Sequence, residues 1–466
     1  MRPVALTITA DNQTKAYGAA LPALTASYSG FVNGDTATSL STGPALSTNA
    51  TAASHVAGNP YTITASGAVD TDYTISYVDG KLSVTPVGLT ISADNKTKTY
   101  GAALPTLTAS YSGFVNGDTP TSLTTLPTLT AGASAASHVA GSPYSITADG
   151  AFDTDYTISY VPGTLTIMPV GLTITAENKT KAYGAALPAL TASYAGFVNG
   201  DTAAALTTQP TLTTTATPSS HVGGNPYSIT VSAAADADYT IAYVAGRLNV
   251  TPAPLIVTAQ GKTMVLNAAA LPVLTVSYNA FVNGDTVASL TTQPSISTTA
   301  TTASPIGAYP ITASGAVDSD YAISYVPGTL SVVFAPSTTS CGGVVGRTVL
   351  QPVNPDSTSV FKGGSTVPIK FRVCDANGNP VGGAISVVKV GADGHADPVV
   401  YNTVNNVGPV DETVVSTTPD ADFRWDSSGQ QFIFNLNTKN LKAGVHYFYR
   451  IDLIDGTSIY FDFGVK

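Results

Sequence analysis

Pairs of aspartates two positions apart are the side chains in this sequence best able to do chemistry. They recur at intervals of 82–83 residues: Asp70 and Asp72, Asp153 and Asp155, Asp236 and Asp238, Asp318 and Asp320. Ca²⁺ takes six to eight oxygen ligands and prefers carboxylates, so these pairs are candidates for a calcium site. An aspartate can instead close an Asx turn by accepting a backbone hydrogen bond two residues on. We favour the turn and predict no metal and no cofactor, with Ca²⁺ as the alternative.

Single histidines recur at the same interval. They are His55, His138 and His221, and the fourth copy of the surrounding pattern carries Pro305 instead. A histidine without a second ligand nearby in the sequence is a poor metal ligand, so we predict that these are loop residues.

Other catalytic groups are scarce. The only two glutamates, Glu177 and Glu412, form no carboxylate pair of the glycosidase type, and no serine or cysteine stands in a nucleophile motif. Only 10% of residues are charged, and the 19 Lys and Arg against 29 Asp and Glu give a net charge of −10. So few basic residues make a positively charged, phosphate-binding surface an unexpected feature of this chain. We predict no enzymatic activity and no nucleic-acid partner.

These residues lie on an internal repeat. The phrase Ala-Ala-Leu-Pro occurs at 19–22, 102–105, 185–188 and 269–272, and Phe-Val-Asn-Gly-Asp-Thr begins at Phe31, Phe114, Phe197 and Phe281. Four copies of a unit of about 83 residues therefore fill residues 5 to 335. This length is too great for a solenoid turn and suits a small β-sandwich.

The elements that position the motifs are expected to be strands. Leu6, Ile8 and Ala10 alternate with threonines, as do many residues of the unit, and this period of two indicates strands with one buried face. Asp79-Gly80 is a hairpin signal. Short proline-containing joints such as residues 85–88 connect the units. We predict an all-β chain of Ig-like sandwiches in an extended rod, roughly 140–170 Å long for four units.

The repeat resembles a known family. Lys15-Ala-Tyr-Gly18, Gly30–Thr36 and Asp72–Tyr77 look like the MBG-type repeat in its Tyr-Gly variant. The resemblance implies small β modules of bacterial surface and adhesin-like proteins, without known catalytic residues. The fourth copy departs from the pattern, because Met264 replaces the lysine and Leu266-Asn267 replace Tyr-Gly. A role that needs the lysine or the tyrosine cannot extend to that copy.

The last part of the chain resembles a second family. Pro368-Ile-Lys-Phe371, the preceding residues from Phe361, and the ending at Lys466 are similar to the PxKF domain of bacterial secreted proteins. The resemblance implies an extracellular β-sandwich without known activity. This part also contains the only cysteines, Cys341 and Cys374. In an exported protein an even number of cysteines in one domain indicates a disulfide, with two free thiols as the alternative.

Repeated tyrosines leave one further choice. Tyr17, Tyr28, Tyr61, Tyr73 and Tyr77 could form a platform that stacks on sugars, but their alternation with threonine and serine favours core positions. The predicted domains are residues 5–86, 87–169, 170–252 and 253–335 for the repeats and 336–466 for the tail.

These patterns favour a non-catalytic bacterial stalk or adhesin-like spacer that projects the tail domain. The expected partner is a surface ligand, a glycan or a protein, and the expected state is a monomeric rod. Carbohydrate-binding accessory modules of a larger protein are the alternative. No apolar run is long enough to span a membrane. No secretion leader precedes Leu6, so we expect a fragment of a longer extracellular or cell-surface protein.

Overall fold

The computed structural model describes residues 2–382 and 423–466. Contacts divide the chain into two compact units, and the division passes through the third repeat. Among the described residues, the first unit contains residues 2–179, 189–215 and 228–247, and the second contains residues 180–188, 216–227, 248–382 and 423–466. The joints between repeats one and two and between two and three lie in the first unit. The joint between repeats three and four and the joint to the tail lie in the second.

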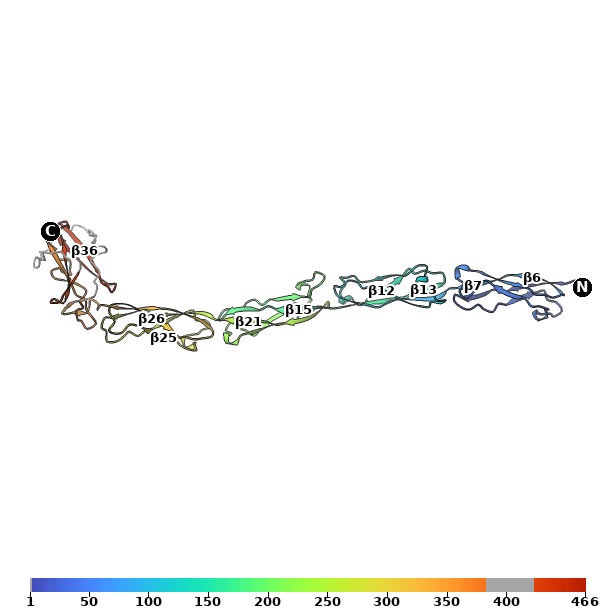
Figure 1. Cartoon of the computed structure of the whole chain (residues 1–466), viewed down its shortest axis with the longest axis horizontal. Helices are drawn as coiled ribbons and strands as arrows, with labels where there is room; N and C mark the ends of the chain where they lie inside the picture. Colours follow the sequence, from blue (N-terminus) through green and yellow to red (C-terminus); the bar gives the residue numbers. More distant parts are fainter. Residues whose placement is uncertain (1, 383–422) are drawn as a thin grey trace. The chain divides into compact units, whose positions relative to one another are not determined.

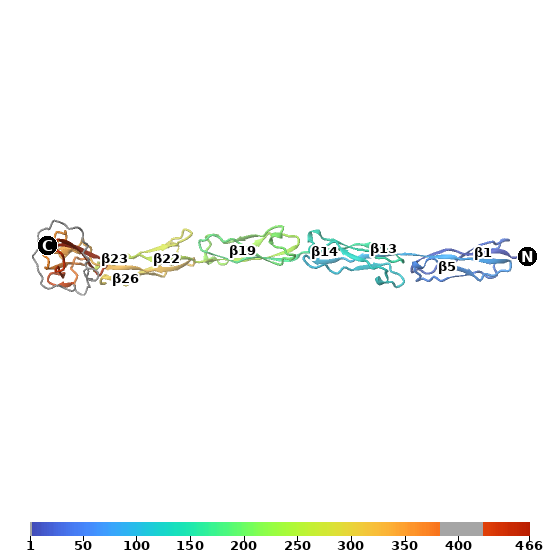
Figure 2. The ribbon, with the colours of Figure 1, turned by 90° about the horizontal axis from the view of Figure 1, so that it is seen from above.

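Seven strands and two short 3₁₀ turns build the first repeat. They are β1 (Val4–Ala10), β2 (Gln13–Ala16), β3 (Ala26–Ser29), η1 (Ala37–Ser39), β4 (Ala45–Thr48), η2 (Val56–Gly58), β5 (Tyr61–Ser66), β6 (Tyr73–Val78) and β7 (Gly80–Thr85). One sheet has the order β3-β1-β6 and the other β2-β7-β5-β4. Strand β1 is parallel to β6, and β2 is parallel to β7. Strands β6 and β7 (Figure 1) and β1 and β5 (Figure 2) run lengthwise through this domain.

The core of the first repeat lies between these two sheets. Leu6 and Ile8 of β1 face Ile63 of β5 and Leu82 of β7, and all four are completely buried. The alternation of apolar and polar residues therefore predicted the buried face correctly in these strands. It failed at the end of β6, where Tyr77 is 36% exposed.

The predicted hairpin at Asp79-Gly80 is wrong. Strands β6 and β7 follow one another almost directly but belong to different sheets, so the chain crosses from one layer to the other there. Gly80 allows this crossing because a Cβ at its position would lie 2.3 Å from the carbonyl oxygen of Ala10.

The same seven strands recur in the next three repeats, but the fourth repeat lacks the second 3₁₀ turn. The second repeat contains β8 (Val87–Ala93), β9 (Lys96–Thr99), β10 (Ala109–Ser112), η3 (Pro120–Ser122), β11 (Thr128–Ala131), η4 (Val139–Gly141), β12 (Tyr144–Asp149), β13 (Tyr156–Val161) and β14 (Gly163–Met168). The third contains β15 (Val170–Ala176), β16 (Lys179–Ala182), β17 (Ala192–Ala195), η5 (Ala203–Ala205), β18 (Thr211–Thr214), η6 (Val222–Gly224), β19 (Tyr227–Ser232), β20 (Tyr239–Val244) and β21 (Gly246–Thr251). The fourth contains β22 (Ala253–Ala259), β23 (Lys262–Val265), β24 (Val276–Asn279), η7 (Val287–Ser289), β25 (Ser295–Thr298), β26 (Gly307–Ser314), β27 (Tyr321–Val326) and β28 (Gly328–Val333).

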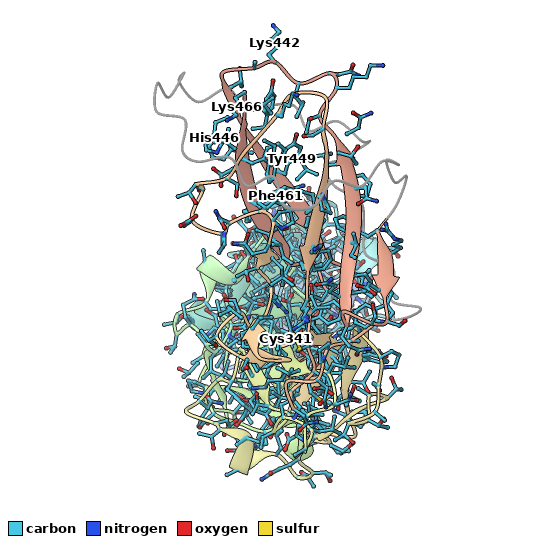
Figure 3. The ribbon with its side chains drawn as sticks, turned by 90° about the vertical axis from the view of Figure 1, so that its left-hand side faces the viewer. Cys341, Lys442, His446, Tyr449, Phe461 and Lys466 are labelled. Atoms are coloured by element: carbon cyan, nitrogen blue, oxygen red, sulfur yellow. A yellow bond between two sulfur atoms is a disulfide. The ribbon has the colours of Figure 1, made fainter. Side chains whose placement is uncertain are left out.

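The tail is a separate β domain with its own core. Its described strands are β29 (Ser340–Cys341), β30 (Val344–Val345), β31 (Val349–Leu350), β32 (Val360–Phe361), β33 (Thr366–Phe371), β34 (Arg424–Asp426), β35 (Gln431–Asn437), β36 (Val445–Asp452) and β37 (Ser458–Val465). Two main sheets, β31-β33-β35-β34 and β32-β37-β36, enclose a core rich in aromatic rings. Tyr449 stacks on Phe461 there, and both lie between the ends of the domain marked by Cys341 and Lys442 (Figure 3).

Within residues 2–382 and 423–466, no helix has the length and apolar character needed to cross a membrane.

Candidate functional site: the joints between repeats

The best-defined cluster of polar side chains lies where one repeat meets the next. We call the first partner the donor end, made in the first repeat by Tyr17, Gly18, His55 and Val56. Strands β2 and β7 are parallel and finish at the same edge, where the Tyr17 amide donates to the Thr85 carbonyl oxygen over 2.9 Å. The residue that opens η2 is His55. Both loops of the donor end therefore project from the edge at which the chain leaves the repeat.

The second partner is the acceptor end, made in the second repeat by Val115, Asp118, Asp155 and Tyr156. The Tyr156 hydroxyl donates to Asp118 Oδ2 over 2.7 Å and accepts a hydrogen bond from the Val115 amide at 3.2 Å. Burial raises the pKa of Tyr156, so the phenol keeps its proton and remains a donor.

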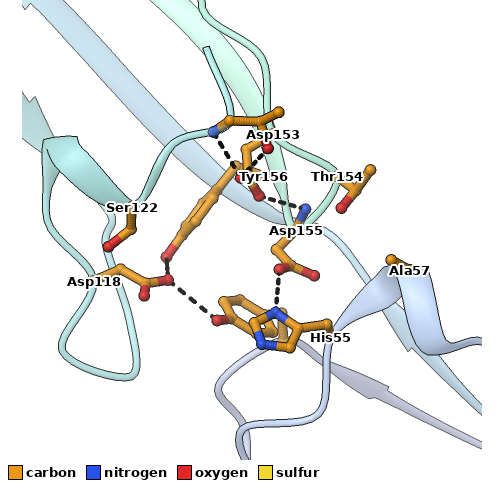
Figure 4. Close-up of a pocket in the computed structure, with 10 residues that line it drawn as sticks. His55, Ala57, Asp118, Ser122, Asp153, Thr154, Asp155 and Tyr156 are labelled. Carbon is orange, nitrogen blue, oxygen red and sulfur yellow. Dashed lines mark hydrogen bonds and ion pairs between the residues drawn. The ribbon is translucent and has the colours of Figure 1, made fainter. Parts of the chain in front are cut away.

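Asp155 connects the two ends. One of its oxygens, Oδ2, lies 2.6 Å from His55 Nδ1, and the other accepts the Val56 amide over 2.6 Å. The Asp155 residue is only 6% exposed, whereas the His55 side chain is 64% exposed. A buried carboxylate needs hydrogen bonds to both oxygens, and the donor end supplies them. Figure 4 shows His55 and Asp155 facing each other across the joint.

Tyr17 makes the second polar connection. Its hydroxyl donates to Asp118 Oδ2 over 3.2 Å, the oxygen that Tyr156 also uses. Its ring stacks on His55 with centroids 5.4 Å apart and meets Tyr156 edge to face at 5.8 Å. Burial raises the pKa of Tyr17 as well, which keeps this phenol protonated. The tyrosine thus orients the histidine and reaches the next repeat at the same time.

The glycine after Tyr17 is required by two features of the joint. Gly18 has φ of +77°, a conformation that favours glycine, and a Cβ there would lie 2.6 Å from Val115 Cγ2 of the next repeat. A side chain at this position would therefore hold the repeats apart.

Lys15 stabilises the donor end from the interior of the first repeat. Its ammonium is buried and donates to the carbonyl oxygens of Ala52, over 3.0 Å, and Ala16, over 3.3 Å. Burial lowers the pKa of Lys15. Since Ala52 leads into the histidine loop and Ala16 into the tyrosine, the lysine links the two loops of the donor end.

The other two joints between repeats have the same contacts. Tyr100 donates to Asp201 over 3.1 Å and Tyr183 to Asp285 over 3.0 Å; His138 lies 2.6 Å from Asp238, and His221 lies 2.6 Å from Asp320. The hydrogen bond to Asp238 raises the pKa of His138. One arrangement therefore occurs three times in the chain.

A polar cavity of about 290 Å³ lies at the first joint and is lined by Tyr17, His55, Asp118 and Asp155 among others (Figure 4). In the part of the chain that the structure describes, no group of three or more His, Cys, Asp or Glu side chains is placed to hold a metal ion.

The aspartate pairs considered as calcium ligands serve other contacts. In all four repeats the first aspartate accepts the amide of the second, over 2.8–2.9 Å, and so forms the Asx turn considered from the sequence. The first aspartates, Asp70, Asp153, Asp236 and Asp318, also accept a serine or threonine amide of their own repeat. Asp155, Asp238 and Asp320 hold the joints, whereas Asp72 is exposed.

The joint to the tail replaces the donor end by different residues. Asn267 donates from its side-chain nitrogen to Asp375 Oδ2 over 3.0 Å, and the Ala376 amide donates to the Leu266 carbonyl oxygen over 2.9 Å. Val265 packs on a cluster that contains the Cys341–Cys374 disulfide, whose Cα atoms are 5.6 Å apart. The fourth repeat departs from the others where it meets a different neighbour.

Sequence reasoning placed the histidines in loops but missed their partners. His55 and Asp155 are 100 residues apart, and no local pattern connects them. A usable signal was present, since Tyr-Gly and histidine are lost together in the one copy that another repeat does not follow. Of the tyrosines considered for a sugar platform, Tyr17 and Tyr73 are buried, at 3% and 6% exposed, whereas Tyr77 is 36% exposed. Glu412 lies outside the described residues.

The comparisons agree with the repeat pattern. A family model described as MBG domain (YGX type) matches residues 6–83, 89–166, 172–249 and 255–331. No curated protein matches the chain at a significant level.

Several solved structures show a distant likeness. The N-terminal eight Ig domains of Down Syndrome Cell Adhesion Molecule are 10% identical, with 100% of this chain and 73% of that chain covered and a TM-score of 0.17. Sidekick-1 immunoglobulin domains 1–5 are 10% identical, with 100% and 99% covered and a TM-score of 0.19. Drosophila OTK extracellular domains 3–5 are 10% identical, with 53% and 72% covered and a TM-score of 0.20. None of these likenesses supports an argument about function.

Proposed function

The chain belongs to the MBG domain family of the YGX type, and from this premise we propose that it is a non-catalytic structural protein. Its four repeats act as a stalk-like or adhesin-like spacer, and they project the tail domain toward a surface ligand. The site of action is a bacterial cell surface or the extracellular space.

The repeated joint is the observation that carries this proposal. A flexible chain of domains needs only a tether, yet each pair of consecutive repeats is also connected by a tyrosine, a glycine contact and a histidine–aspartate pair. Asp155, Asp238 and Asp320 are 6–8% exposed because the preceding repeat covers them. Fixed orientation of neighbours is the property such contacts supply, and a spacer needs it to keep its reach.

Small-angle scattering of the whole chain tests the spacer. A compact chain of 466 residues has a radius of gyration of about 23 Å, whereas a spacer of the length expected from the sequence requires roughly 40 Å or more. We expect the larger radius of gyration for the unaltered chain. A variant that combines Asp155→Ala, Asp238→Ala and Asp320→Ala should have a smaller radius of gyration, because its joints are weakened. A radius near that of a compact chain would refute the spacer.

We propose that the tail is a PxKF-type domain that acts outside the cell. The motif Pro368–Phe371 lies in β33, which pairs with β35 in the domain's main sheet. The Cys341–Cys374 disulfide suits an oxidising compartment. Binding of the whole chain to intact bacterial surfaces or host glycoproteins, compared with a chain that ends before the tail, tests which part makes the contact.

A second candidate function, carbohydrate binding, rests on one feature of the tail. Tyr460 of β37 is 74% exposed and lies directly opposite Arg450 of β36. An exposed tyrosine offers an apolar ring face on which a sugar can stack and a hydroxyl that can hydrogen-bond. Screening the whole chain on a glycan array, with Tyr460→Ala as the control, tests this function. Binding that the alanine variant retains in full would assign it to another surface.

A further inference from the structure

The first repeat carries the complete acceptor end found at the joints. The Tyr73 hydroxyl donates to Asp35 Oδ2 over 2.9 Å and accepts the Val32 amide over 3.1 Å, as Tyr156 does in the second repeat. The Asp72 amide donates to Asp70 Oδ1 over 2.9 Å, so the same turn presents Asp72. Every group that receives a donor end elsewhere is therefore already in position.

In the described residues no donor end covers this surface. Asp72 is exposed, whereas the corresponding Asp155 is 6% exposed, and Val32 is 39% exposed, whereas Val115 is half-buried. The first repeat thus presents two carboxylates, an apolar side chain and a buried phenol in the geometry that holds a neighbour at three other places in the chain.

We propose that this acceptor end, formed by Val32, Asp35, Asp72 and Tyr73, is a docking surface for the donor end of another MBG repeat of the YGX type. The inference rests on the proposed spacer function, since both require that the donor and acceptor ends hold together. The occupant must provide a histidine and the following amide for Asp72, and a tyrosine hydroxyl for Asp35.

The surface also discriminates among repeats. The residue after the tyrosine must be glycine, because a Cβ there meets the valine of the acceptor end at 2.5–2.6 Å in all three joints. The fourth repeat fails on each count, with Leu266 in place of tyrosine, Asn267 in place of glycine and Pro305 near the histidine position. We therefore exclude the end of the fourth repeat as an occupant.

A tethered donor makes the test sensitive. The interface contains few contacts, so a separate repeat binds weakly, while a donor on the same chain acts at a millimolar effective concentration. We would place a copy of residues 1–86 before the whole chain and join its residue 86 to Val4. This join repeats the native spacing, because Val87 follows residue 86 and occupies the place of Val4 in the second repeat.

Spin-label distances report docking in this five-repeat chain. One label replaces Thr62 of the added copy and the other replaces Thr74 of the first repeat; both residues are exposed on strands. The matched control places labels on Thr62 and Thr157, across the native first joint. The two native cysteines form a disulfide and do not react with the label.

We expect one narrow distance distribution across the new joint, matching the native control. The narrow peak should be lost when Asp72→Ala is made in the first repeat of the original chain, or when Gly18→Asn is made in the added copy. A broad distribution that Asp72→Ala does not change, beside a narrow native control, overturns the inference and leaves the spacer intact. A broad native control overturns both. A second fusion, with residues 170–252 joined to Val4, gives the same readout should the first added copy fail to fold.

Discussion

Replacing Asp155 by alanine is expected to weaken the first joint without disturbing the fold of either repeat. The substitution keeps the backbone contacts of residue 155, which are the Val87 amide on its carbonyl oxygen and its own amide on Asp153. It removes only the carboxylate that accepts His55 Nδ1 and the Val56 amide.

The expected loss is about 2–3 kcal/mol. The bond from the Val56 amide to a buried carboxylate contributes about 1.5–2 kcal/mol, near the lower end for bonds to charged groups. The histidine side chain is 64% exposed, so its contribution is screened to about 0.5–1 kcal/mol. Because the second repeat must release this contact when it unfolds, its unfolding free energy falls by the sum. That difference accelerates exchange through unfolding about 30- to 150-fold.

Native-state hydrogen exchange measured by mass spectrometry resolves this effect. A chain of five domains does not unfold in two states, so a single melting curve is uninformative. Exchange of the slowest amides in β8 reports unfolding of the second repeat, and exchange of the slowest amides in β1 reports unfolding of the first. The matched control is Asp72→Ala, whose residue has the same backbone contacts but receives no donor end from the described residues. We expect at most a few-fold change in β1 for this control. If Asp155→Ala accelerates exchange of the slowest amides in β8 no more than the control accelerates it in β1, the Asp155 carboxylate does not hold the joint.

Three further changes test the second joint, the histidine pairing and the tail disulfide. Gly101→Asn keeps a residue that tolerates positive φ but places its side chain against Val198, so distances across the second joint should broaden while the repeats stay folded. The raised pKa of His138 means that pairing with Asp238 stabilises this joint fully below pH 6.5 and less as the pH rises through the folded-state pKa. Exchange in residues 136–142 should therefore accelerate several-fold beyond its intrinsic increase between pH 6 and pH 9, and His138→Gln should abolish that excess. Cys374→Ser opens a disulfide with a sequence separation of 33 and should lower the unfolding free energy of the tail by about 3–4 kcal/mol, seen as faster exchange in β33 and no change in β1.

The all-β fold was predictable because its signals are local. Alternation of Leu6 and Ile8 with threonines gives a strand with one buried face in any context, and four near-identical copies repeat that signal. The family match and the recurring sheets confirm the tandem β repeats. The hairpin at Asp79-Gly80 failed because the same two residues also suit a crossing between sheets, and only the packing of Gly80 on Ala10 distinguishes the two.

The site was less predictable because its contacts span repeats. Nothing near His55 in the sequence indicates Asp155, and the aspartate pairs look alike in all four copies. Their roles differ because, within the described residues, three of the four are covered by the donor end of a preceding repeat, so Asp155 is buried while Asp72 is exposed. The loss of tyrosine, glycine and histidine from the fourth copy contained the missing information, since the domain that follows that copy is a different one.

Donor and acceptor ends are expected to hold consecutive repeats in one orientation. Distances between spin labels at Thr62 and Thr157, measured in the whole chain, test this expectation most directly. We expect a single narrow distribution of distances that broadens in the Asp155→Ala variant. A distribution equally broad with and without the aspartate would instead show that the first two repeats are joined only by their tether.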